Sequence, residues 1–158
     1  MNRIQLFGIG ALCLLAGACG RPADPPIPDG MSRLKVELID APKPEVKEIN
    51  VTITKVTAHS NTAGWVELFK GNQAIDLLKL KDYALPLGFA NLPAGKVTQI
   101  RLYTGGQGPQ NVVLPSGEVV DLKVPSGVQS GIKIKGPFKL ANCQTTVVTL
   151  DFDGRKSI

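Results

Sequence analysis

The chain has 158 residues, 43% of them hydrophobic and 20% charged, with a formal net charge of +5. Without an export signal and a tether, roughly 125 residues remain, enough for one domain with a core and too few for two. The basic residues are spread along the chain with no cluster of four or more. This distribution favours a solvated mixed surface over a nucleic-acid or polyanion patch, although a mild attraction to anionic lipid or polysaccharide stays open.

Residues 1–18 are typical of a lipoprotein signal peptide. Arg3 precedes an apolar run, residues 6–18, that is shorter than the about 20 residues a membrane-spanning helix needs. The run ends in Ala16-Gly17-Ala18, whose small side chains fit a peptidase cleft, and Cys19 then offers a thiol for a diacylglycerol. The alternative is an ordinary secretory signal, cut at the same bond, that leaves Cys19 unmodified. We expect lipidation at Cys19 and, with two or more acyl chains, stable membrane attachment.

The sequence Leu-Ala-Gly-Ala-Cys at residues 15–19 resembles the lipobox of bacterial lipoproteins. The usual pattern has leucine three places before the cysteine, where this chain has Ala16. By the same resemblance, Gly20 after the cysteine implies the outer membrane, because aspartate there is associated with inner-membrane retention. Residues 19–32 carry four prolines, which favour an extended chain, so we expect this lipidated segment to be a linker.

Alternation of apolar and polar residues predicts strands from residue 33 onward. Residues 34–38 form the first, and residues 49–58 the second, with a change of parity that predicts a β-bulge near Thr54 and Lys55. Residues 65–69 and 74–80 are expected to be separate strands on either side of Gly71-Asn72. Residues 82–93 are less regular and are expected to cross between sheets.

The remaining strands follow the same pattern. In residues 96–104, Gln99, Arg101 and Tyr103 share the face opposite the apolar residues. Residues 111–114 and 118–124 are predicted to form a hairpin, and residues 131–140 and 145–153 the last two strands. We therefore predict an all-β fold, a single antiparallel β-sandwich over residues 33–158, with its strand order unassigned.

Several motifs, taken in chain order, resemble one known family: Leu38-Ile39-Asp40-Ala41-Pro42, Gly64-Trp65-Val66, Leu92-Pro93-Ala94-Gly95, Gln99-Ile100-Arg101-Leu102 and Ser130-Gly131-Ile132-Lys133-Ile134. The family is the prokaryotic envelope family called domain of unknown function 4382. The resemblance implies a secreted or lipid-anchored protein, an immunoglobulin-like or transthyretin-like sandwich and no established activity. Family members continue past the end of this chain with one more strand. We therefore expect an unpaired edge strand, from a shortened gene or completed by a partner.

No motif assigns a reaction, so we expect a protein that is not an enzyme and has no cofactor. His59 is the only histidine; it could join Ser60 and an aspartate in a hydrolase site, but no nucleophile elbow accompanies it, and we favour a strand-end histidine. One histidine and one leftover cysteine cannot form a closed zinc site. Asp40, Asp151 and Asp153 are a weak calcium alternative to solvated carboxylates, without a calcium-loop motif.

Two further features are candidates for binding or reactivity. Gln99, Arg101 and Tyr103 could hydrogen-bond sugar hydroxyls, with Trp65 as a stacking platform. The interpretation that we favour places Trp65 in the core and pairs Arg101 with an acid on the next strand. Cys143, left over once Cys13 and Cys19 are accounted for, is expected to be a semi-exposed bystander in a turn.

The leading functional hypothesis is a membrane-anchored envelope lipoprotein with a non-catalytic sandwich that binds a polysaccharide or an envelope protein, and not nucleic acid. The second is a structural envelope protein that assembles through its exposed edge strand. The third and most remote is a hydrolase that uses His59. The oligomeric state stays open.

Overall fold

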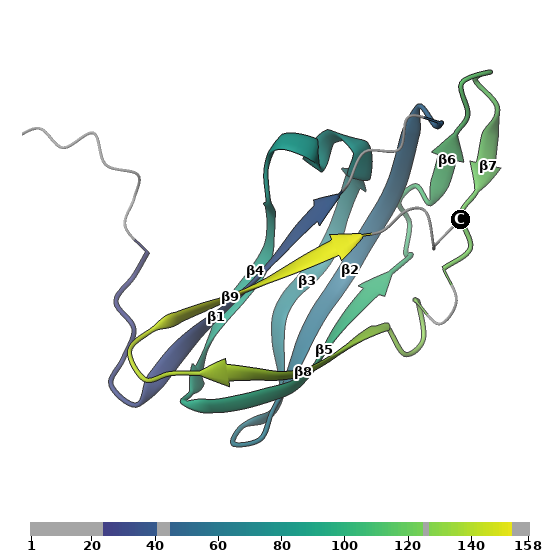
Figure 1. Cartoon of the computed structure of the whole chain (residues 1–158). Coiled ribbons are helices and arrows are strands. Elements are labelled where there is room, and N and C mark those ends of the chain that lie inside the picture. Colours follow the sequence, from purple (N-terminus) through teal and green to yellow (C-terminus); the bar gives the residue numbers. More distant parts are fainter. Residues whose placement is uncertain (1–23, 41–44, 125–126, 153–158) are drawn as a thin grey trace, which may run out of the picture.

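A computed structural model describes residues 24–40, 45–124 and 127–152. These ranges hold nine strands and one 3-10 helix (Figure 1): β1 (Met31–Asp40), β2 (Glu48–Ser60), β3 (Gly64–Asp76), η1 (Leu77–Asp82), β4 (Leu85–Pro93), β5 (Gly95–Thr104), β6 (Asn111–Val113), β7 (Val119–Asp121), β8 (Ile132–Leu140) and β9 (Thr145–Phe152). The predicted all-β sandwich is confirmed.

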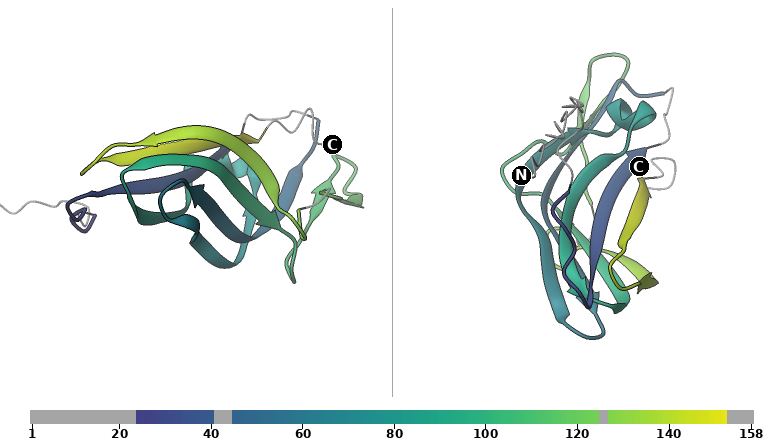
Figure 2. Two further views of the ribbon diagram at one scale, coloured as in Figure 1. Left: turned by 90° about the horizontal axis from the view of Figure 1, so that it is seen from below. Right: turned by 90° about the vertical axis from the view of Figure 1, so that its left-hand side faces the viewer.

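Two sheets make the layers of the sandwich (Figure 2). The smaller sheet has the order β4-β1-β9, and the larger contains β7, β6, β2, β5, β8 and β3. The long strand β2 organises the larger sheet: β3 pairs along one edge, whereas β6 pairs with residues 48–50 and β5 with residues 53–60. Inward side chains of β1 and β2, such as Leu34, Val36, Ile53 and Val56, are buried in the shared core.

The predicted β-bulge in β2 is confirmed. The pairings of β2 with β3 and with β5 both shift register between Ile53 and Lys55. Ile49, Val51 and Ile53 are buried before the shift, and Val56 and Ala58 after it. One extra residue thus returns the apolar side chains to the core, and it leaves Lys55 on the outer face.

Two predictions about the middle of the chain were wrong. Gly71-Asn72 does not end a strand, because β3 continues to Asp76, and residues 77–82 form η1 in place of a strand. The Asp76 side chain caps η1 by accepting a hydrogen bond from the Leu78 N–H at 3.3 Å. Residues 85–93, expected to be irregular, form the regular strand β4. Its prolines are tolerated because β4 is an edge strand, where one side of the backbone needs no partner.

The chain changes sheets between β8 and β9. Strand β8 pairs antiparallel with β5, and β9 then lies parallel to β1, so the sandwich is not antiparallel throughout. Backbone hydrogen bonds fix the intervening turn to the start of β1: Cys143 N–H donates to Met31 O at 2.7 Å, and Arg33 N–H donates to Gln144 O at 2.9 Å. Among the described residues β9 has β1 on one side and no strand on the other, as expected for an edge.

The segment before β1 packs on the outer face of the smaller sheet. It covers Arg33, whose exposed fraction is 1%. The Arg33 guanidinium donates to Pro25 O at 2.7 Å and to Asn91 Oδ1 at 3.1 Å, and it lies 5.3 Å from the centroid of the Phe89 ring. The linker therefore leaves the domain from this face. No helix in the described ranges is long and apolar enough to cross a membrane.

Candidate functional site

The polar stripe predicted on β5 is present. Ile100 and Leu102 are buried, whereas Gln99, Arg101 and Tyr103 lie on the outer face of the larger sheet and are half-buried. Alternation along the strand places them there, because successive side chains point to opposite faces. The Arg101 Nε–H donates to Gln99 Oε1 at 3.2 Å, so the two neighbours in the stripe support each other.

Trp65 is not a core residue, and the interpretation that we favoured from the sequence was wrong. Its side chain is 47% exposed on the outer face of β3. The Arg101 guanidinium carbon lies 4.2 Å from the indole centroid, and the His59 ring meets the indole edge-on at 5.0 Å and 61°. The core is already filled at this level by Ala58 and Ile100, whose side chains point inward. Arg101 thus stacks on an aromatic ring and makes no ion pair within the described part of the chain.

A second cation–aromatic contact extends the stripe. Lys55, which the bulge leaves on the outer face, pairs in register with Tyr103, and its Nζ lies 4.2 Å from the centroid of the Tyr103 ring. Contacts of this kind hold the rings and cations in fixed positions on an otherwise solvated sheet surface. Trp65 and Tyr103 therefore stand at two ends of one patch, with Arg101 between them along β5.

The basic side chains were expected to be scattered, but the sheet gathers many of them. The outward positions of β5, β8, residues 55–60 of β2 and residues 64–70 of β3 form a surface that we call the basic face; Glu48 of β2 and Asp76 of β3 lie beyond it on the same side of the sheet. The charged side chains of the basic face are one carboxylate, Glu67, and seven cations: Lys55, Lys70, Lys96, Arg101, Lys133, Lys135 and Lys139. Strand pairing brings these residues together from four strands. Because they are not consecutive in the sequence, a search for clusters of basic residues along the chain does not find this patch.

The charge on the basic face is not neutralised internally. The ion pairs within the described ranges join Arg33 and Lys35 to Asp24 and Lys79 to Asp76, all away from this face. The cations of the basic face are therefore available to an external anion. Uncompensated charge of one sign on one surface attracts ligands of the opposite sign over distances of about a Debye length.

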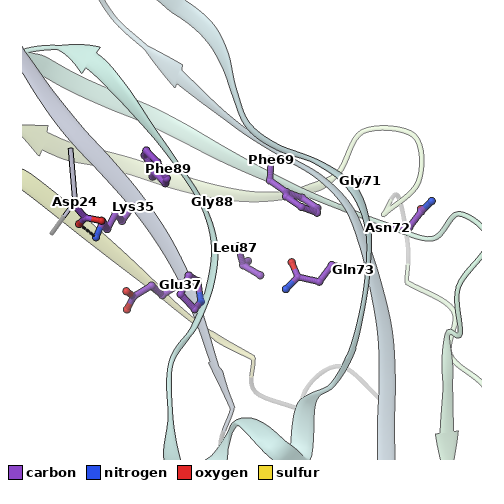
Figure 3. A pocket seen from close by; sticks show the side chains of 11 residues that line it. Asp24, Lys35, Glu37, Phe69, Gly71, Asn72, Gln73, Leu87, Gly88 and Phe89 are labelled. Carbon is purple, nitrogen blue, oxygen red and sulfur yellow. Dashed lines mark hydrogen bonds and ion pairs between the residues drawn. The ribbon is translucent and has the colours of Figure 1, made fainter. Parts of the chain in front are cut away.

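A hollow of about 660 Å³ lies at the open edge between β3 and β4 (Figure 3). Phe69 and Gln73 line it from β3, and Leu87 and Phe89 from β4, with Lys35 of β1 at the rim. Figure 3 shows the Gln73 and Leu87 side chains pointing toward each other across it. Sequence reasoning missed the hollow because its residues come from separate segments and share no motif. Its mixed lining holds no convergent set of polar groups and assigns no ligand.

Asp24 at the rim of this hollow is held by the cations of β1. A hydrogen bond from Lys35 is the main cause that lowers the pKa of the Asp24 carboxyl below its usual value of 3.8; desolvation opposes it, and the charges of Lys35 and Arg33 lower the pKa further. Ionisation of the carboxyl adds the charge attraction to Lys35 and Arg33 and strengthens these contacts. The docking of the linker on the smaller sheet is therefore coupled to the charge of Asp24.

The model of one protein family, described as a domain of unknown function (DUF4382), matches residues 31–158. The chain belongs to this family. No curated protein and no solved structure matches the chain. The match begins at the first residue of β1 and spans every strand of the sandwich, so the DUF4382 domain and the folded unit coincide.

The DUF4382 domain does not bring His59 and Ser60 together. They are consecutive in β2, so their side chains point to opposite faces, and Ser60 is 1% exposed on the inner side. His59 Nδ1 instead contacts Thr98 Oγ1 at 2.9 Å, and Ser60 Oγ contacts Thr62 Oγ1 at the same distance. This arrangement supplies no serine–histidine pair, and His59 serves as the edge-on neighbour of Trp65.

The other candidates fall partly outside the described residues. Cys19 and Asp153 lie outside them, as does the side chain of Asp40, whereas Asp151 is exposed at the end of β9. No group of three or more acidic, histidine or cysteine side chains suited to a metal ion occurs in the described ranges. Cys143 is exposed in a turn, as expected, with a left-handed φ of 55°.

Proposed function

We propose that the chain is an envelope lipoprotein, held on the outer membrane through lipid on Cys19, whose DUF4382 sandwich is a non-catalytic module that binds polysaccharide. The observation that carries the binding assignment is the exposed indole of Trp65, held in place by Arg101 and His59. A fixed, half-exposed aromatic ring beside hydrogen-bonding side chains matches the two surfaces of a sugar, its apolar C–H face and its hydroxyl rim.

Gln99 and Arg101 supply the polar half of this site. Arg101 has guanidinium N–H groups free to donate beyond its bond to Gln99, and the Gln99 amide can donate and accept. Gln99 and Arg101 on β5 and Trp65 on β3 flank the central strand β2 of one sheet, so little ordering is needed on binding.

A glycan array tests this proposal. The probe is the mature chain with Cys19→Ser, which cannot be lipidated, and the variant is Trp65→Ala. We expect binding to a defined subset of glycans and its loss in the variant, while Tyr83→Ala, which removes another half-exposed aromatic ring outside the basic face, keeps the wild-type profile. Equal binding by wild type and Trp65→Ala would contradict the proposal.

The edge strand β9 favours a second candidate, a structural protein that assembles edge to edge. Within the described ranges β9 pairs only with β1, and Val147 on it is 49% exposed. Such an edge can accept a strand from a second chain. Light scattering behind a sizing column tests this: a dimer that Val147→Lys converts to monomer supports edge assembly, and a monomeric wild type contradicts it.

A further inference from the structure

We propose that the basic face binds an acidic polysaccharide, a polymer whose sugars carry carboxylate or phosphate groups. This inference rests on the proposed function and names its ligand class. Its starting point is the imbalance of charge within the basic face, where seven cations meet the single carboxylate Glu67. A neutral glycan needs no such surface.

The shape of the charged area fits a chain more closely than a small ion. Along the paired strands β5 and β8, Lys96 and Lys139 lie opposite each other at one end, Arg101 and Lys133 lie opposite each other further along, and Tyr103 closes the other end. Tyr103 is seven positions after Lys96 in β5, a length of about 23 Å at roughly 3.3 Å per residue. Cations therefore repeat along a stripe that an extended polyanion can follow.

The two aromatic rings of the basic face favour a sugar polymer as the ligand over an anionic surface without sugar rings. Trp65 and Tyr103 each have a cation over the ring, 4.2 Å from its centroid, so an aromatic ring and a positive charge occur together at two points of the face. A uronic acid carries an apolar ring face and a carboxylate in the same molecule. The pairing of ring and cation thus matches an acidic sugar with both of its chemical features.

The basic face and the linker lie on opposite sides of the sandwich. The linker docks on the outer side of the β4-β1-β9 sheet, where Pro25 O and Asp24 contact Arg33. The outer surfaces of two packed sheets point in opposite directions, so the basic face lies on the far side of the sandwich. Asp24 is only five positions after Cys19, a span of at most about 18 Å. An anchor on Cys19 would therefore be tethered on the side of the sandwich opposite the basic face, which leaves that face accessible to an external polymer.

Direct binding measurements test the ligand class. The probes are polygalacturonate and heparin as carboxylated and sulfated polymers, with fully methyl-esterified pectin as the uncharged counterpart of the first. The protein is the mature chain with Cys19→Ser, studied by calorimetry. We expect the acidic polymers to bind, the methyl ester to bind at least about tenfold more weakly, and affinity to fall as salt rises from 0.05 to 0.5 M.

Matched double variants locate the site. Lys133→Gln with Lys135→Gln removes two exposed cations of the basic face, whereas Lys47→Gln with Lys123→Gln removes two exposed lysines elsewhere and changes net charge equally. The first pair is expected to weaken polygalacturonate binding about five- to thirtyfold, from two surface charge contacts, and the second less than about twofold. Circular dichroism checks that both variants stay folded.

The possible results separate this inference from the proposed function. Binding of a neutral glycan that depends on Trp65, without preference for acidic polymers, overturns the inference and leaves the proposed function standing. Equal losses in the two double variants overturn it too. The last test uses vesicles containing 30% phosphatidylglycerol. If the unlipidated chain binds these vesicles through Lys133 and Lys135 and does not bind the acidic polymers, the basic face is a membrane-binding surface and the inference is wrong.

Discussion

The Arg101 guanidinium lies 4.2 Å from the centre of the Trp65 indole, on the outer face of a sheet where a tryptophan was expected to be core. One face of the indole is occupied by a cation, and the side chain is still 47% exposed. This pair is the centre of the binding surface that we assign to the domain.

Fluorescence gives a direct test of this pair, because Trp65 is the only tryptophan. We expect emission typical of a solvated indole and efficient quenching by acrylamide. Arg101→Ala should increase the quenching constant by uncovering one face of the ring, while Lys133→Ala, which removes a cation of the same sheet that does not contact the indole, should leave it unchanged. Emission typical of a buried indole, resistant to acrylamide, would contradict the placement of Trp65.

Gly88 is expected to be intolerant of substitution. A Cβ at this position would lie 2.5 Å from the carbonyl oxygen of Leu68, so β3 and β4 would have to separate where the two sheets meet. We expect Gly88→Ala to lower the free energy of unfolding in urea by about 1–3 kcal/mol. Gly71→Ala is the control, since its Cβ would meet only the Phe69 ring, which can move; an equal cost at both positions would contradict this packing.

Asp24 is expected to titrate below 3.8, since the hydrogen bond from Lys35 and the nearby charges lower its pKa in the folded protein. The folded pKa lies below the unfolded value, so the docked linker is stabilised above pH 3.8 and loses this contribution as pH falls through the folded pKa. Carboxyl NMR titration should show the pKa of Asp24 rising toward 3.8 in Lys35→Gln. Lys47→Gln should not move it, and an identical shift in both variants would argue against the contact.

We expect the Cys143 thiol to be reactive, and we expect the left-handed backbone conformation at this position to lower the stability of the fold. Its thiol is exposed, and its φ of 55° is in the left-handed region that glycine adopts without strain. In the mature chain with Cys19→Ser, one thiol should react with Ellman's reagent without denaturant. Cys143→Gly should be about 1 kcal/mol more stable than Cys143→Ala; the opposite order would show that the turn does not hold this conformation.

The elements that alternate clearly could be predicted from the sequence. The outward row Gln99, Arg101 and Tyr103 and the bulge beside Lys55 follow from parity alone, because a strand with one buried face allows only one assignment of its side chains. Strand β4 and helix η1 were missed for different reasons. The prolines of β4 are tolerated only because it is an edge strand, and the run from Leu77 to Leu80 has no period that separates a strand from a 3-10 turn.

The site itself was only half predictable. Its polar residues lie on one strand, and the sequence shows them as a group. The position of Trp65 depends on the pairing of β3 with β2, and the basic face depends on the register of four strands, so neither can be derived without strand order. A tryptophan and several lysines spaced along a chain have no fixed relation until the sheet is assembled.

Mass spectrometry of the native protein, purified from its own membranes, tests the central claim that the domain is lipid-anchored in the envelope. We expect the N-terminal peptide to begin at Cys19 and to carry the added mass of a diacylglyceryl group, with residues 1–18 removed. A mature N-terminus with an unmodified Cys19 thiol, or a chain that retains residues 1–18, would contradict it.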